Sequence, residues 1–134
     1  MSFHYFRKFL WAALFYLVMS AVSGLINKTH LVDLDKFAQL HFQFLGFIAM
    51  LIYGLGYYLV PKLGKKDLRY PGFVPLHYWL GNLSLITMII CHSVMAVYSD
   101  MWIQNVLYIS IAVQIALLLI FIVAIWKTLS STKK

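Results

Sequence analysis

Charged residues divide the chain into four long apolar stretches. The eleven basic and four acidic residues occupy five places: Arg7 with Lys8, then 28–36, 62–69, Asp100 and 127–134. The uncharged stretches between them cover roughly 9–27, 37–61, 70–99 and 101–126. A helix of about 20 apolar residues, rising about 1.5 Å per residue, crosses a hydrocarbon core of about 30 Å. The pattern therefore predicts four membrane-spanning helices.

We expect one all-α membrane domain over 1–134, a bundle of four transmembrane helices. The predicted helices cover approximately 9–27, 37–60, 75–98 and 103–126. Pro61 is expected to end the second helix, and Pro71, Gly72 and Pro75 to delay the third, because proline lacks the backbone N–H that a helix interior needs. Polar and apolar residues do not alternate as they would in the strands of a membrane barrel.

The first stretch also has the pattern of a secretory signal peptide. Arg7 and Lys8 precede an apolar run that ends near Ala21-Val22-Ser23, and small residues of this kind mark signal cleavage sites. We interpret the segment as the first helix.

Composition indicates that lipid surrounds most of the chain. Hydrophobic residues make up 63% and charged residues 11% of the sequence, whereas soluble domains are about 25% charged. A soluble domain of 134 residues has too little interior to bury so many apolar side chains. These values exclude a soluble enzyme, and a single cysteine excludes a disulfide scaffold.

The basic residues are distributed unevenly between the two sides of the predicted bundle. The N-terminus, the second loop and the C-terminus carry nine basic residues, whereas the first and third loops carry two, Lys28 and Lys36. The positive-inside rule then predicts that both termini are cytoplasmic. The net charge of +7 is thus a signal of topology and of contact with anionic lipid rather than of nucleic-acid binding.

Three histidines lie within the apolar stretches, where ionisable groups are costly and mark functional sites. His41 precedes Pro61 by 20 residues and His92 follows Pro75 by 17. On antiparallel helices these separations place both imidazoles about 25–30 Å from the second loop, near the outer face. His77 follows Pro75 by two residues and belongs near the cytoplasmic face. His41 and His92 can therefore share a ligand, which His77 cannot easily join.

Neutral imidazole is a ligand for haem iron, copper and zinc. The residue pattern alone leaves three alternatives open for His41 and His92: a haem site, a copper site that adds Cys91, Met88 and Met95, and hydrogen bonds between helices. The third alternative applies equally to His77. Acidic residues are restricted to the loops, which argues against a di-iron carboxylate bundle and against a Ser-His-Asp triad.

Several segments of helices two and three carry a family resemblance. They are 41–47 (HFQFLGF), Tyr53-Gly54, 57–62 (YYLVPK), His77-Tyr78-Trp79 and His92. They lie within a stretch of about 55 residues, and they resemble subunit I of the haem–copper oxidases. The closest similarity is to the C-family (cbb-type) oxidases and their nitric oxide reductase relatives.

The resemblance implies roles for the three histidines. His41 matches a histidine that ligates copper, and the same motif in another helix of the family supplies a haem b ligand. His92 matches the second member of a His-His pair, with Cys91 in the first position. His77 matches a histidine that is not a core metal ligand, although we keep it as a third cofactor-binding candidate beside His41 and His92.

The resemblance covers only part of the family pattern. Subunit I has twelve helices in three arcs of four, and this chain has one arc. The C-family active-site tyrosine would stand about seven residues before His92, where this chain has Ser84 and Leu85. The pattern therefore lacks a complete dinuclear site, and oxidase or nitric oxide reductase activity stays an open question.

The resulting expectation is a multi-pass haem b protein of the bacterial cytoplasmic (inner) membrane. It would transfer electrons or bind O2 or NO, with copper as a further metal and a respiratory protein as redox partner. A homotrimer would rebuild the twelve-helix ring of subunit I. The alternative is a haem-free or copper-handling four-helix subunit or assembly factor of a respiratory complex.

Overall fold

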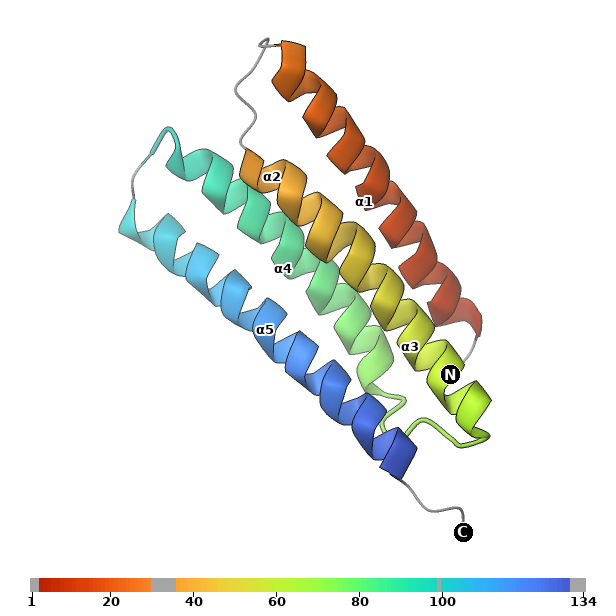
Figure 1. Cartoon of the computed structure of the whole chain (residues 1–134). Helices are drawn as coiled ribbons and strands as arrows, with labels where there is room; N and C mark the ends of the chain where they lie inside the picture. The colour runs from red at the N-terminus through yellow and green to blue at the C-terminus, as the bar shows by residue number, and fades with distance from the viewer. Residues whose placement is uncertain (1–2, 30–35, 99, 131–134) are drawn as a thin grey trace.

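The computed structural model describes residues 3–29, 36–98 and 100–130, shown in Figure 1. Its elements are α1 (Phe3–Thr29), α2 (Lys36–His41), the π-helix η1 (Phe42–Ala49), α3 (Met50–Gly64), α4 (Phe73–Met95) and α5 (Met101–Ser130). The elements α2, η1 and α3 follow one another directly and form one span, Lys36–Gly64. Four helical spans in the described part are long and apolar enough to cross a membrane, which confirms the predicted four-span all-α fold.

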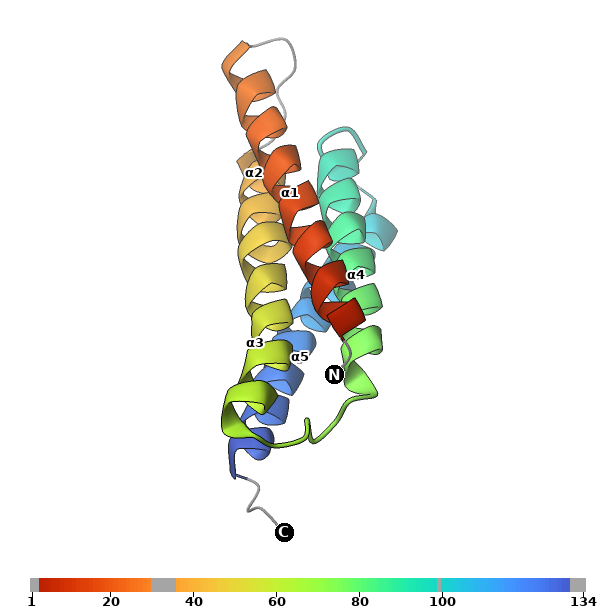
Figure 2. The same cartoon turned by 90° about the vertical axis from the view of Figure 1, so that its right-hand side faces the viewer.

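The four spans run up and down beside one another. In Figures 1 and 2, α1 and α5 lie on opposite sides of the molecule, with the α2–η1–α3 span and α4 between them. The start of α1, the end of α5 and the α3–α4 connection lie at one end of the bundle. We call it the basic end, because it carries Arg7, Lys8, the segment 62–69 and Lys127. We call the opposite end, where α2 begins, the Phe37 end.

Helix boundaries differ from the predicted ones by up to six residues, and two of the differences lie at prolines. Pro61 lies inside α3, which continues to Gly64 instead of ending at the proline. The helix ends where Lys65 adopts a left-handed conformation (φ 49°) and the amide of Lys66 donates to the Pro61 carbonyl at 3.0 Å. Pro75 lies in the first turn of α4, where backbone N–H groups have no partner within the helix and proline is tolerated.

The start of α5 also differs from the prediction, and it has a local cause. Asp100 caps α5, because its carboxylate accepts a hydrogen bond from the Trp102 amide at 3.0 Å. This hydrogen bond satisfies an N–H that would otherwise be unpaired at the start of the helix. α5 therefore begins before the predicted residue 103. Four of the charged residues counted for orientation, Asp33, Asp35, Lys133 and Lys134, lie outside the described residues.

α1 packs closely along the α2–η1–α3 span. A Cβ added to Gly46 of η1 would lie 2.5 Å from Cβ of Tyr16 on α1, and one added to Gly54 of α3 would lie 2.7 Å from Cβ of Phe9. Any larger residue would force the helices apart, so glycine sets this close approach. α1 is thus an integral part of the bundle, as expected of a first helix.

Candidate functional site

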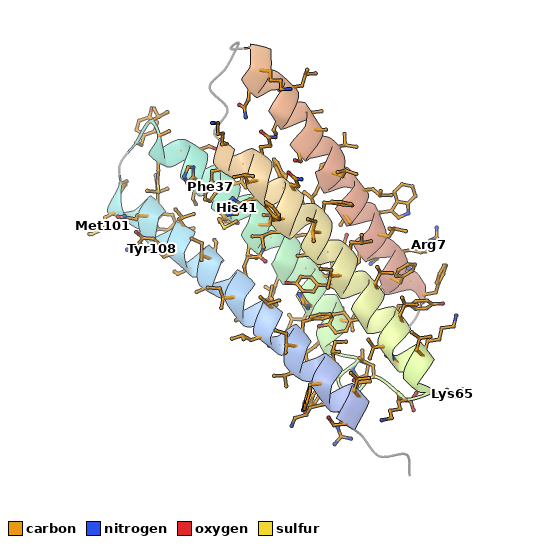
Figure 3. All side chains as sticks on the ribbon, in the orientation of Figure 1. Arg7, Phe37, His41, Lys65, Met101 and Tyr108 are labelled. Carbon is orange, nitrogen blue, oxygen red and sulfur yellow. The ribbon has the colours of Figure 1, made fainter. Side chains whose placement is uncertain are left out.

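The side chain of Phe37 lies between His41 and His92. Its ring centroid is 3.8 Å from that of His41, with planes inclined by 27°, and 3.7 Å from that of His92, with planes inclined by 4°. Two rings that stack this closely on a third ring occupy its opposite faces. Figure 3 shows Phe37 and His41 on α2 near one end of the bundle. The two histidines from different spans therefore lie at the same level, as predicted from their similar distances to the connecting loop.

Helical spacing explains how the stack is built. Phe37 and His41 are four residues apart, so they share one face of α2. That face packs against α4, whose last turn includes His92. Both histidines are half-buried, so the stack lies at the edge of the core.

A backbone hydrogen bond fixes the orientation of the His41 ring. Nδ1 of His41 is 2.7 Å from the carbonyl oxygen of Phe37. A carbonyl only accepts, so Nδ1 carries the proton and Nε2 carries the lone pair. Metal-bound histidines commonly donate their other ring N–H to a carbonyl in this way. The π-helix η1 begins directly after His41, and π-helical turns are frequent at functional sites.

Sulfur-containing residues are close to His92 in the sequence of α4 and are possible metal ligands. Met88 is 1% exposed and belongs to the core, whereas Cys91 is half-buried with a free thiol. Among the described residues, no group of three or more histidine, cysteine, aspartate or glutamate side chains is placed to hold a metal ion. Any site at His41 and His92 would rely first on the two imidazoles.

His77 lies apart from this pair, in the core toward the basic end. It precedes His92 by 15 residues on α4, which corresponds to about 22 Å along the helix axis. It is 1% exposed, and its Nδ1 is 2.8 Å from the hydroxyl of Tyr57 on α3. Its Nε2 is buried and has no hydrogen-bond partner among the described residues.

Aromatic rings from the other three spans surround His77. The ring centroid of Tyr53 on α3 is 4.2 Å away, that of Phe9 on α1 is 6.1 Å away and that of Phe121 on α5 is 6.3 Å away. His77 therefore joins all four spans at one level. This arrangement is typical of a histidine that specifies helix packing through a hydrogen bond.

Other polar contacts also connect the helices, and those of Gln114 and Tyr16 had not been identified from the sequence. Gln114 of α5 donates to the Gly81 carbonyl and to the Ser84 hydroxyl of α4, both at 2.9 Å. Tyr16 of α1 donates to the side-chain oxygen of Asn82 at 2.8 Å. Both contacts satisfy polar groups that would otherwise be unpaired inside an apolar bundle.

The contact between Tyr57 and His77 follows from the same helix register that paired His41 with His92. On two antiparallel helices, residues at equal distances from the connecting loop face the same level. The pairs 41/92 and 57/77 are both centred on residues 66–67. The register that brings His41 to the level of His92 therefore also brings Tyr57 to His77.

Comparisons with protein-family models, with curated proteins and with solved structures found no match to this chain. The resemblance to subunit I of the haem–copper oxidases therefore depends on the quoted residues alone.

Proposed function

We propose that this chain is an integral protein of the bacterial cytoplasmic membrane that binds haem b at His41 and His92. Its role would be electron transfer or the binding of O2 or NO. The observation that carries the proposal is the meeting of two membrane-embedded imidazoles on the two faces of Phe37. Imidazole is a common axial ligand of haem iron, and ionisable residues inside a membrane are costly unless they serve a function.

The two imidazoles are suitable ligands for haem iron. The ring of Phe37 between them limits how they can bind it. His41 has the tautomer of a ligand, with Nδ1 donating to a carbonyl and Nε2 able to bind iron. Ligation of one iron by both histidines requires the Phe37 ring to leave the space between them. Ligation by one histidine leaves that ring in place. The first mode suits electron transfer, and the second leaves a position for a gas.

Bound haem would supply one-electron redox chemistry or a gas-binding iron. The chain's own residues would determine its position and surroundings. Phe37 supplies an apolar ring beside the histidines, and the carbonyl of Phe37 holds the His41 imidazole in one tautomer. An apolar environment excludes water and tunes the redox potential of an iron centre.

We further propose a homotrimer with both termini cytoplasmic. The position of α1 and α5 supports it, because they lie on opposite sides of the protomer in Figures 1 and 2 and each presents an outer face to a neighbour. Three such protomers would form a ring of twelve helices. The mass of the protein in mild detergent tests this oligomer, and a stable monomer or dimer would contradict it.

The position of Phe37 also favours a second candidate function, a haem-free subunit or assembly factor of a respiratory complex. In this interpretation the stack of His41, Phe37 and His92 is a packing element, as the contact between Tyr57 and His77 is. A copper-handling role would additionally require Cys91. These alternatives predict a colourless protein whose helices still assemble when His41 and His92 are replaced.

The test is the haem content of protein purified from cells that receive a haem precursor. Pyridine haemochrome spectra of wild type, His41→Ala, His92→Ala and a His4→Ala control measure this content. His4 is exposed near the start of α1, at the other end of the bundle. We expect haem in the wild type and the control, and a loss in both other variants. A colourless wild type would favour the haem-free function.

A further inference from the structure

An apolar groove runs along α4 and α5 at the basic end of the bundle. One hollow of about 390 Å³ is lined by Arg69, Tyr70, Pro71, Gly72, Phe73 and Leu76. A second hollow of about 280 Å³ shares Tyr70 and Phe73 and adds Leu119, Ile120 and Val123 of α5. The shared aromatic residues connect the two hollows, so the groove leads from the α3–α4 connection onto the side of α5.

We propose that this groove binds an anionic phospholipid, with its phosphate at Arg69 and one acyl chain along α5. The inference does not depend on haem binding. It rests on the arrangement of charge and apolar surface around the groove.

Cationic residues lie on both sides of the groove mouth, which is the end of the groove between the α3–α4 connection and the end of α5. Arg69 lines the first hollow. Lys127 follows Leu119 and Val123 at four-residue intervals, so it lies on the same face of α5 as the groove wall. The amide of Arg69 donates to the Thr128 hydroxyl at 3.2 Å, which holds the connection beside Lys127. Within the segment 62–70 the only acidic residue is Asp67, so the mouth has a net positive charge.

The length of the groove matches one leaflet of a bilayer. Val123 and Leu119 precede Lys127 by four and eight residues, which corresponds to about 6 and 12 Å of depth along the helix. One leaflet of hydrocarbon is about 15 Å thick. A phosphate at the level of Arg69 and Lys127 therefore places an acyl chain against the apolar wall.

Charge complementarity favours a lipid over a second copy of the chain. A neighbouring protomer inserted in the same direction carries its own basic end at the same level, so it cannot neutralise Arg69 and Lys127, whatever contacts it makes elsewhere on the bundle. An anionic headgroup instead neutralises Arg69 and Lys127, and each basic residue near a membrane surface contributes about 1 kcal/mol to such binding, or about fivefold in affinity.

Native mass spectrometry of the full-length protein in detergent tests the proposal. The probes are phosphatidylglycerol and phosphatidylcholine with identical acyl chains. We expect tighter binding of phosphatidylglycerol, and we expect Arg69→Gln to weaken it about fivefold. Phosphatidylcholine binding should fall less, because choline already balances the charge of its phosphate. Val123→Trp, which fills the groove and leaves the charges intact, should weaken the binding of both lipids. Val123 is 50% exposed, so tryptophan fits there without disturbing the core.

Lys28→Gln is the matched control, because Lys28 is exposed on α1 near the other end of the bundle. It should leave the binding of both lipids unchanged. The proposal is overturned by equal binding of the two lipids, or by equal losses in Arg69→Gln and Lys28→Gln. A fall in oligomer mass caused by Val123→Trp without any change in lipid binding would assign the groove to contact between protomers and would also overturn it.

Discussion

The ring of Phe37 lies parallel to the imidazole of His92, with centroids 3.7 Å apart and planes inclined by only 4°. The opposite face of the same ring stacks on His41. Aromatic pairs of this kind contribute about 0.5–1.5 kcal/mol each beyond their buried area. Phe37 therefore stabilises the Phe37 end of the bundle and separates the two histidines at the same time.

Replacing Phe37 by leucine separates these two effects. We expect Phe37→Leu to lower the free energy of unfolding by about 1–3 kcal/mol, because both stacking contacts are lost. The substitution also removes the ring that lies between the two imidazoles, whereas the backbone carbonyl that holds His41 remains. Haem uptake should therefore become faster. Unfolding in mixed micelles measures the first effect, and the growth of the haem absorbance measures the second.

Phe44→Leu is the control for this substitution, since Phe44 is 55% exposed on η1. It should change neither quantity. Slower or unchanged haem uptake in Phe37→Leu would show that Phe37 does not restrict access to the histidines. Phe37 would then contribute to helix packing only.

The hydrogen bond between Tyr57 and His77 should couple α3 to α4. Tyr57→Phe removes the partner of a buried Nδ1 and should cost about 1 kcal/mol of stability, a typical value for interhelical hydrogen bonds in membranes. His77→Phe should cost more, because it also disturbs the surrounding rings. In a double-mutant cycle the two losses should add to more than the loss of the combined variant. Strict additivity would exclude a stabilising bond.

Gly46 should tolerate no side chain. The Cβ of Gly46→Ala would lie 2.5 Å from Cβ of Tyr16, and overpacking of this kind costs about 1–3 kcal/mol. At Gly72 an added Cβ meets nothing within 4 Å and φ is −66°, so Gly72→Ala is the matched control and should be neutral. Equal thermal stability of the two variants would contradict the close contact between α1 and η1.

The proposed orientation predicts which loops face the outside. In a Cys91→Ala background, Lys28→Cys should react with a membrane-impermeant maleimide added to spheroplasts, whereas Asp67→Cys should react only after lysis. Both positions are exposed, so access from each side decides the result. The reverse pattern would place the termini outside and contradict the excess of basic residues as a topology signal.

The spans and the register of the helices followed from the sequence because lipid imposes simple rules. Charged residues are restricted to the ends of helices, and equal distances from a loop define a common level. Those rules located the four spans and the level of His41 and His92. The same register places Tyr57 opposite His77, but this contact was found only in the structure.

Other features depend on side-chain packing, which residue spacing does not specify. Phe37 precedes His41 by one helical turn, so its shared face was available from the sequence, but its place between two imidazoles requires a particular rotamer and a particular approach of α4. The π-helix Phe42–Ala49 has no distinct residue signature. Pro61 was expected to end its helix, but a left-handed Lys65 ends it one turn later.

Titration of the purified protein with haem in detergent tests the central claim most directly. The wild type should develop a saturable Soret band, and the double variant His41→Ala/His92→Ala should develop none while it keeps its helical circular dichroism. Addition of CO to the reduced complex then separates ligation by one histidine, which shifts the band, from ligation by both, which does not. A wild type that binds no haem, or a double variant that binds it equally well, would contradict the proposed function.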